Sequence, residues 1–191
     1  METIERYGTE DLKKKWLDPL LAGDIRSAFA MTEPDVASSD ATNIATRIER
    51  DGDDYVINGT KQWITNSVEG NVLAVLVKTD LHLEPRHRGM SLVIVEKLAG
   101  YKAHKLAKLG YKGVDTGEVS FADVRVPVAN LVGADEGRGL QQILSGLALG
   151  RINVAARGVG VANAALGASL RYAQLRETFG KPIGQHQAIQ I

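Results

Sequence analysis

The feature that most constrains the fold is a proline-free stretch from Gly137 to Thr178. It is rich in alanine, leucine and glycine, and it predicts one helix of roughly forty residues, or two helices joined at a kink. Phe179-Gly180 and then Pro182 mark its end. Because so long a helix cannot bury both of its faces against one small domain, we expect either a fragment of a larger protein or a subunit that packs against partner chains.

The region before this helix has the spacing of an antiparallel β-fold. Asp51-Gly52 and Asn58-Gly59 are dipeptides that favour hairpin turns. Short apolar stretches between turn residues predict strands at 44–50, 55–57, 61–65, 72–78, 90–96, 101–108 and 119–124. We therefore predict an α+β fold, in which an antiparallel β-barrel or sandwich forms the middle domain and helices flank it. One flanking helix is expected to start after Thr9, its N-cap, and to end near Leu21.

The composition removes several function classes. The chain has 191 residues with 23 basic and 23 acidic side chains, so no net field favours nucleic acid or an anionic membrane. The absence of cysteine excludes thiol catalysis, disulfides and cysteine-ligated metals. The first residues lack the apolar core of a secretory signal, and no apolar stretch approaches the roughly 20 residues of a membrane-spanning helix. We expect a cytoplasmic protein with no membrane span.

Two motifs are better explained by packing and solvation than by binding. Gly158-Val159-Gly160 resembles part of a dinucleotide-binding motif, but it lies inside the long helix instead of at a helix start after a strand. His82 and His87 share a polar loop with Arg86 and Arg88, whose positive charges oppose a metal ion. We therefore predict no metal site.

Three segments remain as candidate binding sites. Ala28–Ile44 has no basic side chain and many hydroxyls. In Gln62–Asn66, Trp63 and Thr65 lie two positions apart on a strand, so a flat apolar ring and a hydroxyl share one face, which suits a planar heteroaromatic ligand. Arg176–Gln187 places an arginine, an aromatic ring and amide donors at a helix end, which suits a phosphate and a base. Taken singly, the second is also explained by a half-buried tryptophan and the third by a helix end with a turn.

Five motifs connect these segments. They are Thr32-Glu33-Pro34, Asn58-Gly59-x-Lys61-x-Trp63-Ile64-Thr65-Asn66, Phe121-x-Asp123-Val124-x-Val126-Pro127, Arg176-x-x-Phe179-Gly180-x-Pro182-Ile183 and His186-Gln187. In order and spacing they resemble the acyl-CoA dehydrogenase family, over essentially the whole chain. The resemblance implies three parts: residues 1–27 as the end of an N-terminal helical domain, 28–134 as the middle β-domain, and 135–191 as the start of a C-terminal helical domain.

The resemblance implies FAD as cofactor and an acyl-CoA thioester as substrate. Thr32 would donate to the polar edge of the flavin, Trp63 would pack against the isoalloxazine ring, and Thr65 would bond near the hydride-accepting nitrogen. The full set of implied cofactor-binding residues is Phe29, Met31, Thr32, Ser38, Trp63, Ile64, Thr65, Arg176, Thr178, Phe179, His186 and Gln187. Ser38 or Ser39, together with Arg151, would contact the CoA moiety.

Partners follow from the same resemblance. In the family, residues equivalent to Arg176–Gln187 often reach the FAD of a neighbouring subunit, which implies a homo-oligomer, either a dimer or a tetramer. Electron-transfer flavoprotein is the implied electron acceptor.

Two departures from the family pattern keep alternatives open. The turn Asp35–Ser39 replaces a glycine-rich turn with one serine, and it resembles a less common branch that favours longer or hydroxylated acyl chains. No catalytic residue is predicted, because the resemblance implies a catalytic carboxylate that usually lies beyond Ile191. The positions where other members carry a carboxylate are Gly150 and Ala148 here. The chain is therefore expected to be a truncated acyl-CoA dehydrogenase without its catalytic carboxylate. The alternatives are a non-catalytic FAD/CoA-binding or scaffolding fragment, and an oxidase or monooxygenase of the same superfamily.

Overall fold

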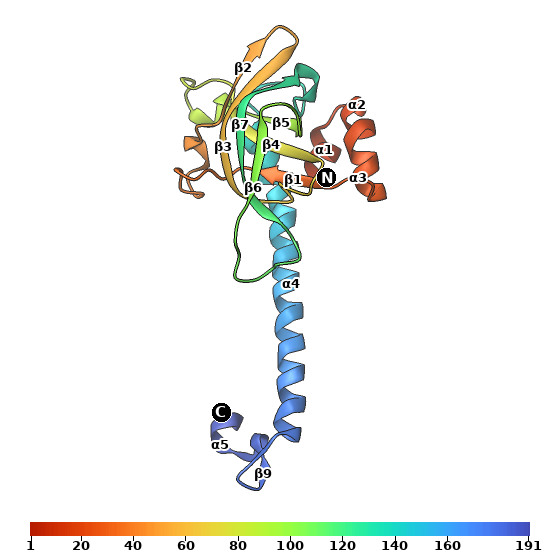
Figure 1. Cartoon of the computed structure of the whole chain (residues 1–191), viewed down its shortest axis with the longest axis vertical. Helices are drawn as coiled ribbons and strands as arrows, with labels where there is room; N and C mark the ends of the chain where they lie inside the picture. The colour runs from red at the N-terminus through yellow and green to blue at the C-terminus, as the bar shows by residue number, and fades with distance from the viewer. The chain divides into compact units, whose positions relative to one another are not determined.

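Residues between Ser27 and Pro127 form one curled, mixed sheet of seven strands (Figure 1). The strands are β1 (Ser27–Ala30), β2 (Arg47–Asp51), β3 (Asp54–Thr65), β4 (Val72–Lys78), β5 (Met90–Glu96), β6 (Tyr101–Lys105) and β7 (Thr116–Pro127). Their order is β1-β4-β2-β3-β7-β6, and β5 also pairs with β4.

The computed structural model describes all 191 residues, which form two compact units, Met1–Gly146 and Leu147–Ile191. The three-part division expected from the sequence stays a prediction.

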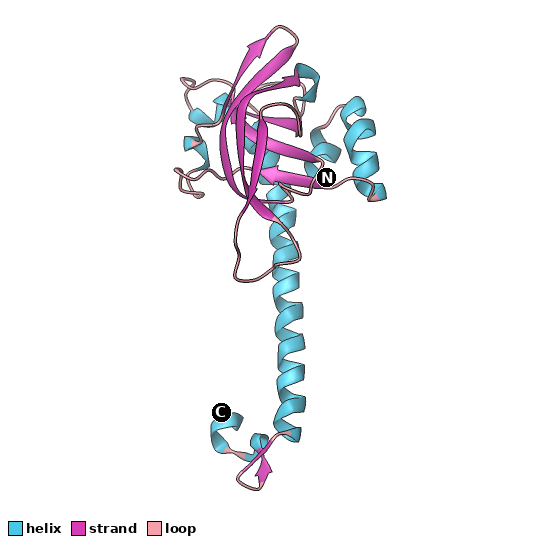
Figure 2. Cartoon of the chain, in the orientation of Figure 1, coloured by secondary structure: helices cyan, strands magenta, loops and turns pink.

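Most of the pairings are antiparallel, as the sequence predicts, and helices flank the sheet (Figure 2). The predicted α+β class is confirmed. Two pairings differ: β1 and β4 run parallel, with Ser27 opposite Val72, and β2 meets β4 in a parallel pairing of Arg47 with Lys78. The short strand β1 was not among the predicted strands.

The predicted turn at Asn58-Gly59 is wrong, because both residues lie inside the continuous strand β3. The Asn58 amide donates to Asp123 Oδ1 at 3.0 Å, and the Asp123 main-chain N–H donates to Asn58 Oδ1 at 3.0 Å. The register of β3 and β7 shifts between Ile57 and Gly59, where Gly59 has a φ of 147°. The glycine therefore allows the register of the pairing to shift within a continuous strand. The predicted Asp51-Gly52 hairpin is confirmed, since β2 and β3 pair up to Asp51 and Asp54.

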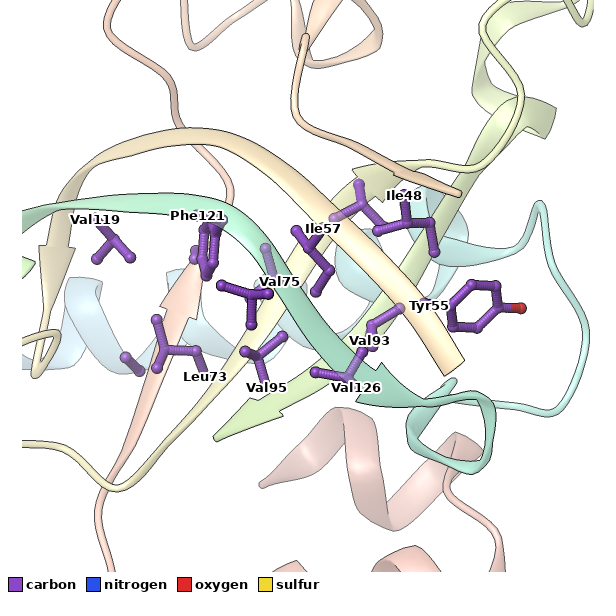
Figure 3. Packing of buried hydrophobic residues seen from close by; sticks show 14 of the residues in the cluster. Ile48, Tyr55, Ile57, Leu73, Val75, Val93, Val95, Val119, Phe121 and Val126 are labelled. Atoms are coloured by element: carbon purple, nitrogen blue, oxygen red, sulfur yellow. The ribbon is translucent and has the colours of Figure 1, made fainter. Parts of the chain in front are cut away.

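The core lies on the concave side of the sheet and consists mainly of β-branched side chains (Figure 3). Ile57, Val75, Val93 and Val126 are fully buried there. Burying each such side chain stabilises the fold by about 1.5–3 kcal/mol. This packing makes the sheet a rigid support for the residues at its edges.

The N-terminal helices are α1 (Glu2–Tyr7), α2 (Glu10–Leu12) and α3 (Asp18–Ala22), with a π-helical segment, Lys13–Leu17, between the last two. The Thr9 hydroxyl accepts from the main-chain N–H of Leu12 at 3.3 Å, which confirms the predicted cap. Gly23 ends α3 with a φ of 83°. The helix predicted after Thr9 is therefore present, interrupted by one wider turn.

The long helix α4 (Gly139–Leu175) is a single helix of 37 residues, so the kinked alternative is wrong. Its first turns are fixed to the sheet: a Cβ on Gly139 would lie 2.4 Å from the Ser91 carbonyl carbon, and the Gln142 amide donates to the Val132 carbonyl at 2.9 Å.

The remaining elements are short. They are the strands β8 (Glu177–Thr178) and β9 (Lys181–Pro182), the helix α5 (Gln187–Gln190), and 3-10 turns at Ala41–Asn43, Arg86–Gly89, Val128–Asn130 and Ile183–Gln185. No helix combines the length and the apolarity required to cross a bilayer.

Candidate functional site

The end of β3 presents Trp63 and Thr65 on its outer face. The pairing of β3 with β7 is irregular between Lys61 and Ile64, and Trp63 has a φ of 64° in this irregularity. The Trp63 side chain is 62% exposed and Thr65 is exposed, whereas Ile64 between them is only 2% exposed. The indole and the hydroxyl thus share one face, as the strand period predicts. Only the main chain of Ile64 is available on that face.

The segment Met31–Glu33 lies directly beside this irregularity. The Gln62 main-chain N–H donates to the Thr32 carbonyl at 2.8 Å, and the Thr32 hydroxyl donates to the Gln62 carbonyl. Phe29, on β1, is 40% exposed between the buried Ala28 and Ala30. Thr32 is therefore held next to Trp63 by main-chain and side-chain hydrogen bonds together.

Ser38 and Ser39 lie exposed in the loop Pro34–Ile44, hereafter the hydroxyl loop. Ser38 lines a narrow cavity together with Met31, Thr32, Glu33, Val36, Ala37, Ala41 and Ile44. The structure therefore brings Ser38 close to Thr32, and both belong to the predicted binding set.

A buried ion pair supports this arrangement. Lys61 Nζ lies 2.8 Å from Glu33 Oε1, and the two side chains are 0% and 5% exposed. Burial by itself would raise the pKa of Glu33, but the Lys61 charge and the hydrogen bonds from Lys61, Thr46 and Ala45 lower that pKa below its ordinary value. Burial lowers the pKa of Lys61 to about 8, and the Glu33 charge opposes this shift.

Neither Lys61 nor Glu33 was among the predicted site residues. One indication was available, because strand alternation places Tyr55, Ile57 and Lys61 on the same face of β3. A lysine on the core face of a strand requires a buried partner. The carboxylate of Glu33 is that partner.

The third candidate segment, Arg176–Gln187, lies in the unit Leu147–Ile191. Thr178 Oγ1 and His186 Nε2 are 3.2 Å apart, and the rings of Phe179 and His186 meet edge to face with centroids 6.2 Å apart. The Phe179 side chain is 98% exposed and its φ is 52°. Arg176 and Gln187 are exposed nearby in sequence, and Arg151 is exposed on α4. This hairpin presents an aromatic ring, and the histidine is held in place behind it.

The fold is shared with acyl-CoA dehydrogenases of known structure. The structure of acyl-CoA dehydrogenase from Geobacillus kaustophilus matches with a TM-score of 0.94 and 38% identity, over 98% of this chain and 50% of that chain. The glutaryl-CoA dehydrogenase of Mycobacterium smegmatis, solved in complex with FADH2, matches with a TM-score of 0.89 and 35% identity, over 98% and 47%. These similarities define the class of protein as that of the acyl-CoA dehydrogenases.

Residues 28–124 match the family model for acyl-CoA dehydrogenase, middle domain, and residues 137–191 match the one for acyl-CoA dehydrogenase, C-terminal domain. Acyl-CoA dehydrogenase family member 11 of Gallus gallus is 44% identical over 196 residues, which cover 99% of this chain and 25% of that protein. The chain belongs to the acyl-CoA dehydrogenase family. It spans between a quarter and a half of the length of these relatives.

The residues at the end of β3 fit a flavin. The exposed indole of Trp63 offers a flat apolar surface, and the hydroxyls of Thr65 and Thr32 offer polar groups beside it. A tryptophan with a positive φ is uncommon, and such strained positions cluster at binding sites. The flat surface of Trp63 and the free hydroxyl of Thr65 suit an isoalloxazine ring, whereas the Thr32 hydroxyl already donates to the Gln62 carbonyl.

Proposed function

We propose that this chain forms part of a flavin-dependent acyl-CoA dehydrogenase, which desaturates an acyl-CoA thioester between Cα and Cβ. The observation that carries the proposal is the exposed Trp63–Thr65 surface beside Thr32, in a chain of this family. When bound, FAD accepts the hydride that leaves Cβ as the α-proton is removed.

The residues of the chain have three tasks in this proposal. Trp63 covers the ring and excludes water, which strengthens nearby hydrogen bonds. Thr65 holds a polar part of the cofactor with its hydroxyl group, and the Thr32 hydroxyl, which donates to the Gln62 carbonyl, can only accept. Ser38 or Ser39 holds the CoA moiety from the hydroxyl loop.

We assign no catalytic base to this chain. Glu33 precedes the hydroxyl loop, but its carboxylate already accepts hydrogen bonds from Lys61, Ala45 and Thr46. A carboxylate with a lowered pKa and three donors is a poor proton acceptor. This observation favours a second candidate function, a piece that binds FAD and CoA without catalysis.

The proposal extends to assembly and electron transfer. The proposed contact to the FAD of a neighbouring subunit, in a dimer or tetramer, is made by Phe179, His186 and Arg176. Electron-transfer flavoprotein is the proposed electron acceptor.

The test is the visible absorption spectrum of the purified chain before and after addition of FAD. A bound-flavin spectrum supports the proposed site, and bleaching by an acyl-CoA without oxygen separates the dehydrogenase from the non-catalytic piece. Trp63→Ala should weaken FAD binding by about tenfold, since an aromatic contact contributes about 0.5–1.5 kcal/mol beyond burial. Leu81→Ala, which also removes an exposed apolar side chain, is the matched control. Unchanged FAD affinity in Trp63→Ala contradicts the site.

A further inference from the structure

Both ends of the hydroxyl loop meet at a single carboxylate. Glu33 directly precedes Pro34, the first residue of the loop. Its Oε2 accepts from the main-chain N–H of Ala45 at 2.6 Å, and its Oε1 accepts from that of Thr46 at 3.0 Å. The residue before the loop therefore binds the two residues that follow it.

Lys61 completes this closure from β3. Its ammonium donates to Glu33 Oε1 at 2.8 Å and to the Met31 carbonyl at 3.0 Å. The lysine side chain is fully buried, so water cannot replace either partner. A buried charge without its partner is strongly unfavourable, which makes the two residues mutually dependent.

Within the loop, other connections are few and local. The main-chain N–H of Asp40 donates to the Ala37 carbonyl at 2.8 Å, and that of Asn43 donates to the Asp40 carbonyl at 3.0 Å. One side-chain bond leaves the loop, from Arg86 to Asn43 Oδ1 at 2.8 Å, and it is exposed to solvent. The position of the loop over Thr32 therefore depends mainly on how its ends are held.

We propose that Lys61 and Glu33 are positioning residues that hold the hydroxyl loop closed and thereby set the affinity for the CoA thioester. The second half of this proposal rests on the proposed function, since it needs Ser38 or Ser39 to contact CoA. The first half rests on the contacts around Glu33 alone.

Hydrogen exchange read by mass spectrometry tests the closure. In Lys61→Met and in Glu33→Gln, exchange across residues 34–46 should become roughly tenfold faster or more, because each change leaves one buried group unpaired. The double variant removes both charges and should exchange more slowly than either single variant. Arg125→Met is the matched control, because it breaks an ion pair with Asp51 and Asp54 at the surface of the same sheet.

The pattern of exchange decides the first half of the proposal. Faster exchange confined to residues 34–46 supports the closure. Unchanged exchange in residues 34–46 overturns the closure, because the ion pair would then have no effect on the loop. An equal increase across β4 and β5 also overturns it, because the pair would then act only through global stability.

Calorimetric titration with coenzyme A tests the second half. Each single variant should bind coenzyme A about tenfold more weakly, because a displaced loop misplaces its hydroxyls, and the double variant should recover part of the loss. Unchanged affinity in a variant with a mobile loop overturns the link to substrate binding. A wild-type chain that binds neither FAD nor coenzyme A would instead contradict the proposed function, and the exchange result would still decide the closure.

Discussion

At the scale of single residues, Trp63 combines strain with exposure. Its φ of 64° places a bulky residue in the left-handed region, and its side chain gains little from burial. Such a conformation costs roughly 1–3 kcal/mol and persists only where the surroundings enforce it. The regular pairing of β3 with β7 on both sides of the irregularity provides that constraint.

Trp63→Gly should separate strain from binding. Glycine adopts a positive φ without steric cost, so the substitution should leave the free energy of unfolding unchanged or raise it by up to about 1 kcal/mol, while FAD binding weakens by about tenfold or more. Urea unfolding and flavin titration measure the two effects. Trp63→Ala is the control, since it should weaken FAD binding to a similar extent without the gain in stability. A clear destabilisation of Trp63→Gly relative to Trp63→Ala would contradict the assignment of strain.

The ion pair of Glu33 with Lys61 predicts how the stability of the fold changes at acid pH. The folded pKa of Glu33 lies below its ordinary value of 4.5, so this carboxylate stabilises the fold fully above about pH 4.5 and loses the contribution as pH falls toward the folded pKa. Lys61, with a pKa of about 8, stays charged throughout this window. The difference in unfolding free energy between wild type and Glu33→Gln should therefore shrink between pH 7 and pH 3.5. An equal difference at both pH values in urea titrations would count against the pair.

Sequence patterns predicted some of these residues and missed others for physical reasons. The shared face of Trp63 and Thr65 followed from the two-residue period of a strand. The burial of Lys61 was missed because lysine is almost always exposed, and its partner Glu33 lies 28 positions earlier in the chain. Pairing across that distance depends on how β3 and the segment after β1 meet, which no local pattern records.

At the scale of elements, β3 has a glycine where the segment that leads into β2 approaches it. A Cβ on Gly59 would lie 2.5 Å from Thr46 Oγ1 and 2.7 Å from Thr46 Cα. The glycine therefore allows Thr46, which follows the hydroxyl loop, to pack against β3.

Gly59→Ala should destabilise the chain by about 2 kcal/mol or more, because it combines overpacking with an unfavourable φ. Gly110→Ala is the matched control, since no heavy atom lies within 4 Å of its added Cβ, and it should change stability by less than about 0.5 kcal/mol. Urea unfolding measures both. Equal stabilities of the two variants would mean that the sheet adjusts freely at β3.

The elements differ in how well local patterns predict them. α4 was predicted because a long segment lacks proline and is rich in alanine and leucine, and β4 and β5 because each is a nearly continuous apolar stretch. β1 was missed because it has only four residues and pairs in parallel with the distant β4. The Asn58-Gly59 turn was wrongly predicted because that dipeptide also suits an irregular strand held by Asp123.

At the scale of the whole molecule, the two units differ in their apolar burial. The first has an extensive core. In the second, apolar side chains of α4 such as Val161 and Leu170 are 64% and 56% exposed. Exposed apolar side chains in such numbers are typical of surfaces that other chains cover.

We therefore predict that the chain self-associates with rising concentration. Sedimentation should show a dimer or larger species, and Val161→Glu combined with Leu170→Glu should shift it toward the monomer, because charges oppose apolar burial. Gln174→Glu, on the same helix, adds charge without removing an apolar side chain and should have little effect. A monomer at every concentration would argue against a homo-oligomer.

The closure of the hydroxyl loop at Glu33 has a consequence for divergence within the family. Since the groups that tie the loop lie at its two ends and on β3, residues 35–43 can change in length and composition without altering the sheet. The entropic cost of lengthening is small, about 0.6 kcal/mol for each doubling of a loop. We therefore expect that loops from relatives, grafted between Glu33 and Ala45, change the CoA contact proposed for Ser38 or Ser39 and leave the sheet unaltered.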